Sequence, residues 1–187
     1  MRGLHFFLYI DDSMSQGWYT LGYMRAKKTV MCVGINGEKT EVPVEKLTFR
    51  PSVYAVITEG DKVLLSSQWD GWDFPGGGIH IDENLDEAFE REVKQETGLS
   101  VKRDKLLHVG ESFFAHPDTG QYFHTILLFY TCKDISGTVS ATVASSGEKV
   151  YVREAKWIPF SEVAALKFYN QVDSPALVRL GAEGKGM

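Results

Sequence analysis

Residues 84–97 constrain the fold most, because they have the pattern of one amphipathic helix with a defined start and end. Asn84 and Glu87, three positions apart, predict an N-terminal capping box, and Gly98 predicts the C-terminal end. At about 100° per residue, one stripe of this helix collects its apolar side chains. These are Leu85, Ala88, Phe89 and Val93. The stripe predicts a helix that packs on a hydrophobic core.

Two carboxylates lie within this apolar stripe. With Leu85 placed at 0°, Glu92 falls near 340° and Glu96 near 20°. Burial of their charges is unfavourable, the charges repel each other one turn apart, and Glu96 meets the negative end of the helix dipole. A divalent cation would remove all three penalties, and hard oxygen ligands suit Mg2+. Pairing with Arg or Lys, or a helix end exposed to water, are alternatives that the helix alone leaves open.

The rest of the chain has the pattern of strands with two further helices. Asn36 and Gly37 predict the turn of an N-terminal hairpin. The expected strands cover residues 29–33, 40–44, 52–58, 62–67, 106–114, 122–132 and 150–157. Short helices are expected near Ser161 and from Ser174, with a loop at 137–147 and a frayed tail at 181–187. This order predicts an α/β class fold, an α/β/α sandwich around a mixed sheet, with the hairpin as an N-terminal extension.

The acidic net charge limits the kinds of partner that the chain can bind. The net charge of -5 and the isoelectric point near 5.5 argue against a broad basic face that holds nucleic acid. An anionic small molecule remains compatible, because a bound divalent metal supplies local positive charge.

The cysteines and the N-terminus indicate a cytoplasmic protein. Cys32 and Cys132 have no metal-type spacing, so we expect two buried free thiols, which suit a reducing compartment. Residues 4–10 faintly resemble a signal peptide, but Asp11 and Asp12 interrupt the short apolar run and no small-residue cleavage site follows. No apolar stretch approaches the roughly 20 residues that a membrane span needs.

Reading outward from the helix reveals a longer motif. Gly77 is followed after five residues by Glu83, and after seven more by the run Arg-Glu-Val-Lys-Gln-Glu-Thr-Gly-Leu at 91–99. This resembles the Nudix box, G-x5-E-x7-R-E-U-x-E-E-x-G-U, where U is aliphatic. The one departure is Gln95, which stands where the pattern has the first Glu of its Glu-Glu pair. The resemblance extends from about residue 48 to 180, so we expect an extension at 1–48, which could add a dimer contact, and a hydrolase domain at 49–187.

The resemblance implies an activity and a metal site. Nudix hydrolases split a nucleoside diphosphate linked to a moiety X, and ADP-ribose or nucleotide-sugar type substrates are favoured here. The family pattern assigns Glu92, Glu96 and the backbone carbonyl of Gly76 to Mg2+, for which Mn2+ could substitute. Arg91 would pair with Glu83 and steady the loop, with a place for Glu83 near the metal as the alternative. Gln95 brings no charge, so fewer or weaker metal sites are expected.

The general base and the substrate contacts are less defined. Glu92 is one candidate base, and in many similar enzymes a Glu from a late loop serves instead, which Glu148 and Glu154 match by position. Side chains near the expected site could contact substrate: Arg50, Trp72, Phe114 and Tyr122. Two other functions stay open: a house-cleaning nucleoside triphosphate pyrophosphatase, and a Nudix-fold sensor that binds nucleotides without cleaving them. The acidic net charge of the chain disfavours a third function, that of an RNA 5′-end pyrophosphohydrolase.

Overall fold

The computed structural model describes residues 28–140 and 152–183. Within these ranges the chain forms a ten-stranded mixed sheet, three α-helices and one 3-10 helix. The strands are β1 (Thr29–Val33), β2 (Lys39–Pro43), β3 (Leu47–Phe49), β4 (Ser52–Glu59), β5 (Lys62–Gln68), β6 (Gly71–Asp73), β7 (Gly76–Gly78), β8 (Ser100–Ala115), β9 (Tyr122–Ser136) and β10 (Val152–Pro159). The helices are η1 (Val44–Lys46), α1 (Leu85–Thr97), α2 (Phe160–Val163) and α3 (Ser174–Glu183).

The sheet is mixed in direction, as expected. Its main order is β10-β5-β4-β9-β8-β1-β2, with β3 on β9, β6 on β5 and β7 on β4. β4 and β9 run parallel at the centre, whereas β8 and β9 form a long antiparallel hairpin. The short strand β7 lies antiparallel to the start of β4, which brings the glycines to the central strand.

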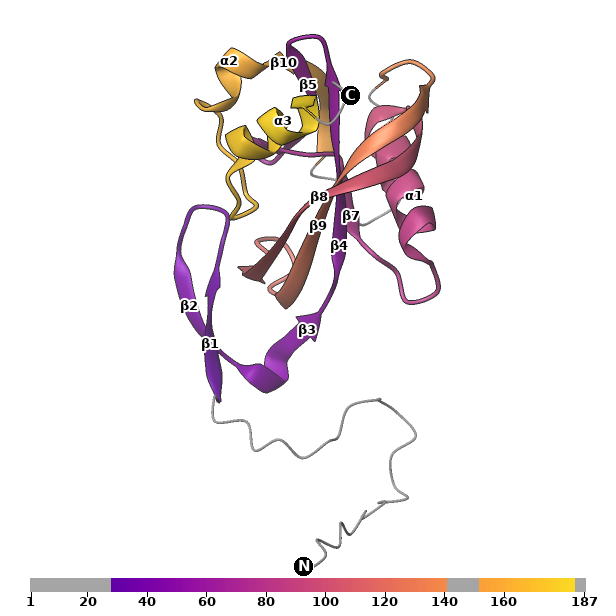
Figure 1. Cartoon of the computed structure of the whole chain (residues 1–187). Helices are drawn as coiled ribbons and strands as arrows, with labels where there is room; N and C mark the ends of the chain where they lie inside the picture. Colours follow the sequence, from indigo (N-terminus) through magenta and orange to yellow (C-terminus); the bar gives the residue numbers. More distant parts are fainter. Residues whose placement is uncertain (1–27, 141–151, 184–187) are drawn as a thin grey trace, which may run out of the picture.

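Helices cover both faces of the sheet (Figure 1), with α1 on one side and α2 and α3 on the other. Val53, Ala55 and Ile57 of β4 pack in one core cluster with α1. Val56, between them, packs in the second cluster with Val163 of α2 and two residues of α3. The predicted α/β sandwich is therefore confirmed. β4 is buried on both faces because each face has its own helical layer.

The predicted ends of α1 are confirmed. The Asn84 side chain accepts hydrogen bonds from the backbone N–H groups of Asp86 and Glu87, and the Glu87 carboxylate accepts from the Asn84 N–H at 2.8 Å. Gly98 takes the left-handed conformation, with φ of 78°, which favours glycine at a helix end. These two caps fix the length of the helix and therefore the orientation of its inward stripe.

Several element boundaries differ from the predictions. β8 begins at Ser100 rather than near 106, because pairing with the end of β9 stabilises a polar segment that lacks apolar alternation. The short strands β3, β6 and β7 were not predicted, and β7 consists of the glycine stretch at 76–78. The tail expected to fray begins inside α3, where Gly181 is buried against Val56. Residues 184–187 and most of the predicted 137–147 loop lie outside the described residues.

The N-terminal hairpin is present. β1 and β2 pair antiparallel around the Asn36-Gly37 turn, and β1 joins the sheet where Val33 pairs with Phe114 of β8. The proposed boundary at residue 48 falls within β3, which pairs with β9. Both cysteines are buried free thiols, as predicted. Among the described residues, none of the helices is long and apolar enough to cross a membrane.

Candidate active site

The glycines of β7 and the carboxylates of α1 meet on one side of β4. The Gly76 N–H donates to Glu96 Oε2 at 3.2 Å. A Cβ atom on Gly77 would lie 2.7 Å from Glu92 Oε1, so the Glu92 carboxylate rests against the bare backbone of this strand. The exposed fractions of Glu92 and Glu96 are 1% and 2%. The helical wheel therefore placed both carboxylates correctly, and neither is wetted by an emerging helix end.

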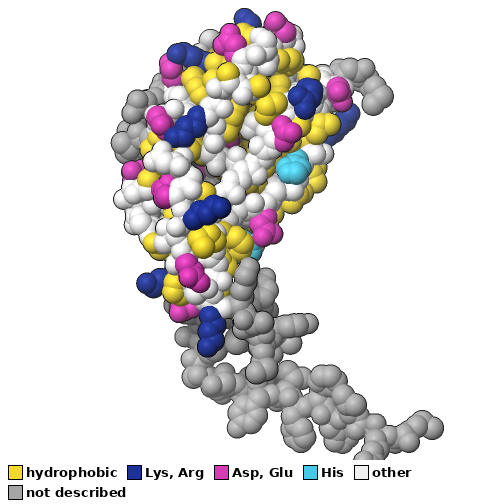
Figure 2. Space-filling view, turned by 90° about the vertical axis from the view of Figure 1, so that its left-hand side faces the viewer, with side chains coloured by type: hydrophobic (Ala, Val, Ile, Leu, Met, Phe, Trp, Pro, Cys, Tyr) yellow, Lys and Arg dark blue, Asp and Glu magenta, His cyan; other side chains and the backbone are white. Residues whose placement is uncertain are grey.

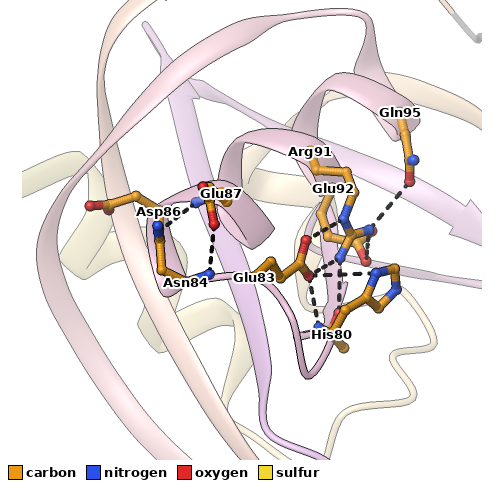
Figure 3. Close-up of polar contacts among 9 residues, drawn as sticks. His80, Glu83, Asn84, Asp86, Glu87, Arg91, Glu92 and Gln95 are labelled. Carbon is orange, nitrogen blue, oxygen red and sulfur yellow. Dashed lines mark hydrogen bonds and ion pairs between the residues drawn. The ribbon is translucent and has the colours of Figure 1, made fainter.

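Arg91 organises the polar side of the box (Figure 3). Its Nε donates to Glu83 Oε2 at 2.8 Å, and its Nη2 donates to the Gly78 carbonyl oxygen at 3.1 Å. The predicted pair between Arg91 and Glu83 is present, and hydrogen bonding from Arg91 lowers the pKa of Glu83 to about 2. The Glu83 carboxylate also accepts from the His80 N–H. Glu83 thus acts as an anchor between the loop and α1.

Arg91 also pairs with one of the inward carboxylates. Its Nη1 donates to Glu92 Oε1 at 2.8 Å and lies 3.5 Å from Gln95 Oε1. For Glu92, the structure therefore shows the alternative in which the inward carboxylate pairs with an arginine. Glu96 instead accepts from the glycine backbone and has Ser66 beside it. Gln95, the departure from the box, lies on the Arg91 side of this arrangement.

A third buried carboxylate, Asp73, was missed by the sequence reasoning. It is 3% exposed on β6, and burial raises its pKa to about 7, although the Phe74 N–H donates to it at 2.9 Å. Burial also raises the pKa of Glu96 to about 8, and the charge of Asp73 adds to this shift. The signal available in the sequence was an acidic residue directly flanked by two aromatic residues, Trp72 and Phe74.

The chemistry of these donors fits Mg2+. Among residues 28–140 and 152–183, no three His, Cys, Asp or Glu side chains are grouped so that they could hold a metal by themselves. Mg2+ is commonly bound through one or two carboxylates, with water and substrate phosphates completing its shell. Glu92 and Glu96 supply two such carboxylates, and the glycines of β7 beside them line an adjoining pocket.

An open pocket adjoins the glycine strand, with about 760 Å³ of empty space including solvent at its mouth. One wall is a stripe across three neighbouring strands: Ser52, Tyr54, Ser112, Phe114, Phe123, Thr125 and Leu127. Within this stripe Ser112 pairs with Thr125, and Phe114 pairs with Phe123. The remaining lining residues are Arg50, Gln68, Trp69, Asp73, Gly76, Gly77, Gly78, His116, Tyr169 and Asn170.

Two of the four predicted substrate contacts line this pocket. Arg50 and Phe114 do, whereas Trp72 packs on the core cluster beneath α2 and α3, and Tyr122 packs against the N-terminal hairpin. Successive residues of a strand point to opposite faces, so Phe123 faces the pocket and Tyr122 cannot. The predictions for Trp72 and Tyr122 are therefore not supported by their positions.

The structure describes only one of the two late-loop candidates for the general base. Glu154 lies on β10, pairs with Lys156 at 2.6 Å, has a side chain 41% exposed and is not part of the pocket lining. This is the environment of a solvated surface charge. Glu148 lies outside the described residues. A general base from this loop therefore stays a prediction.

The fold and the box define a Nudix-type α/β domain, and comparison with known proteins agrees. The NUDIX domain model matches residues 48–180, so the chain belongs to the Nudix hydrolase family. It is 40% identical over 62 residues to an RNA pyrophosphohydrolase of Xanthomonas campestris pv. campestris (strain B100), which is 32% of this chain and 30% of that protein. The chain thus matches about a third of the length of such relatives.

Solved structures show the same fold. The MutT protein from Methanosarcina mazei Go1 superposes with a TM-score of 0.56 at 20% identity, over 74% of this chain and 97% of that one. The E. coli ORF135 protein superposes with a TM-score of 0.53 at 22% identity, over 78% of this chain and 97% of that one. Identities this low establish the shared fold alone.

The raised pKa values predict a pH dependence of metal binding. Carboxyls with raised folded-state pKa stabilise the metal-free fold at low pH and lose that contribution as pH rises toward about 7 for Asp73 and about 8 for Glu96. Mg2+ needs the ionised form, so it should displace a proton below these values. We expect Mg2+ to bind about tenfold or more tightly near pH 8.5 than near pH 6. Calorimetry in buffers of different ionisation enthalpy measures the protons released, and equal affinity without proton release would contradict this.

Proposed function

We propose that this chain hydrolyses the diphosphate linkage of a nucleoside diphosphate linked to a moiety X, by attack of water on phosphorus. ADP-ribose and nucleotide-sugar type compounds are the favoured substrates. The observation that carries the proposal is the pair of buried carboxylates, Glu92 and Glu96, held against a glycine strand that lines an open pocket. A structural role alone would not require two inward carboxylates at this place, because burial of charge is unfavourable.

Glu92, Glu96 and the Gly76 carbonyl are the residues that would hold Mg2+, or Mn2+ in its place. When bound, such a cation neutralises phosphate charge and lowers the pKa of a water molecule. Glu92 is the candidate that accepts the proton of the attacking water, since it lies against Gly77 at the edge of the pocket. Arg91 positions Glu92 through their hydrogen bond and ties it to the glycine strand through Gly78.

Arg50 is the residue best placed to bind a phosphate. Its guanidinium lies across the glycine strand, because a Cβ atom on Gly78 would come within 1.9 Å of its Nε. The same guanidinium lies 5.5 Å from the centre of the Phe123 ring. Among the described residues, no carboxylate forms an ion pair with Arg50. It can therefore donate hydrogen bonds to a substrate phosphate beside the carboxylates.

A small nucleotide suits this site better than a long nucleic acid. The net charge is -5, and Figure 2 shows acidic and basic side chains intermixed over the face drawn, without a broad basic area. The similarity to RNA pyrophosphohydrolases covers about a third of the chain. A nucleoside triphosphate pyrophosphatase would use the same carboxylates, and a nucleotide sensor is favoured only by the missing charge at Gln95.

A substrate panel tests the proposed function. With Mg2+ or Mn2+ present, we expect release of a nucleoside monophosphate from at least one of ADP-ribose, UDP-glucose and related compounds, at a higher kcat/KM than pyrophosphate release from triphosphates. The variant R50A should lower kcat/KM by about tenfold or more, because a charged hydrogen bond to phosphate is lost. A preference for triphosphates would favour the pyrophosphatase. Nucleotide binding without turnover of any compound would favour the sensor.

A further inference from the structure

The turn between β5 and β6 holds a tryptophan in an unusual backbone conformation. Trp69 has φ of 44°, in the left-handed region that bulky residues rarely adopt. The following residues, Asp70 and Gly71, complete the turn and place Asp73 two residues further on. Strained conformations of this kind persist only where surrounding contacts hold them, and they often occur at ligand sites.

Contacts from distant segments hold this turn. The Trp69 indole Nε1 donates to Asp118 Oδ2 at 3.1 Å. The Asp70 N–H donates to the Tyr169 hydroxyl oxygen at 3.0 Å, while Lys167 Nζ donates to both carboxylate oxygens of Asp70 at 2.9 Å. The Tyr169 ring also meets the Trp69 ring edge-on, with centroids 5.0 Å apart. The indole is therefore fixed in orientation before any ligand arrives.

The Trp69 indole lies at one end of a row of side chains in the pocket, and Arg50 lies at the other end. Arg50 lies over Phe123, and Phe123 pairs across the sheet with Phe114. The Trp69 centroid is 6.5 Å from that of Phe114 and 5.8 Å from that of His116. All five side chains line the pocket. The row runs from the residue that would bind phosphate to an aromatic wall without a cationic side chain.

We propose that the wall of Trp69, Phe114 and His116 binds the nucleobase of the substrate by stacking, with Trp69 as the main contact. This inference rests on the proposed function, because it assumes that phosphate binds at the Arg50 end. A planar base gains contact with aromatic rings that a sugar or phosphate does not. Burial lowers the pKa of His116, so its ring is neutral near pH 7 and suited to stacking. Tyr169 and Asp118 act as positioning residues.

Binding of products without metal provides the test. AMP, UMP and ribose 5-phosphate are titrated into the full chain in EDTA and followed by calorimetry. We expect W69L to weaken binding of at least one nucleotide by about tenfold or more, while binding of ribose 5-phosphate changes less than about threefold. W69F should retain part of the affinity. Y169F, which keeps the ring but removes the hydroxyl, should give an intermediate loss. W72F, a substitution outside the pocket, is the matched control.

The outcomes separate this inference from the hydrolase proposal. Unchanged nucleotide affinity in W69L would overturn the inference, as would an equal loss for ribose 5-phosphate, which would indicate a structural role. On an active substrate, W69L should raise KM by about tenfold or more and change kcat less than about threefold. If the chain cleaves nothing but W69L still loses nucleotide binding, the hydrolase proposal fails and the base site stands. Equal unfolding midpoints of W69L and W69F confirm that both variants are folded.

Discussion

Replacement of Glu96 by glutamine is expected to lower kcat by about 100-fold or more, because the proposed metal ligand loses its charge. The same change should stabilise the metal-free protein near pH 8.5, where the wild-type carboxyl is ionised while buried. This follows from the sign of the shift: burial raises the pKa of Glu96 to about 8, so the buried charge destabilises the fold above that pH. Steady-state kinetics and urea unfolding in EDTA measure the two effects.

E90Q is the matched control on the same helix. Glu90 pairs with Lys102 at the surface, with side chains 36% and 57% exposed, so its neutralisation should leave kcat within about twofold. A decrease in activity in E96Q without a gain of stability near pH 8.5 would mean that ionisation of Glu96 does not destabilise the metal-free fold. An unchanged kcat in E96Q would contradict the proposed role of Glu96 as a metal ligand.

Replacement of Arg91 by methionine should cost about 2–4 kcal/mol of unfolding free energy, because Glu92 and Glu83 lose their main cationic partner while they stay largely buried. The Arg91 side chain is only 23% exposed, and it also holds the carbonyl of Gly78. We expect kcat/KM to fall by about tenfold or more as well, since Glu92 is no longer positioned. Urea unfolding and steady-state kinetics give both quantities.

Arg103 offers a matched control for this change. It joins β8 to the same helix through Asp86 at 2.7 Å, but the Asp86 side chain is 60% exposed. R103M should therefore cost less than about 1 kcal/mol. Equal losses in R91M and R103M would show that the box arginine contributes no more than a surface pair, and the description of Arg91 as an organiser of the site would then be wrong.

Much of the local structure could be predicted from the sequence. The capping box at Asn84, the helix end at Gly98 and the inward positions of Glu92 and Glu96 all follow from interactions within one helix. The pair between Arg91 and Glu83 came from the family pattern, which records a contact that helix geometry alone does not reveal. Predictions for single aromatic residues were less successful, because strand alternation decides whether Phe123 or Tyr122 faces the pocket, and the register was not known.

Sequence alone determined helix α1 and the inward positions of its two carboxylates, because helix periodicity and caps depend on neighbours within a few positions. Only the tertiary structure decided what surrounds them. Asp73 lines the pocket because β6 pairs with β5, and Trp69 is held by Asp118 and Tyr169, which lie 49 and 100 positions away along the chain. Such contacts arise from the order of strands in the sheet, which short-range patterns do not encode.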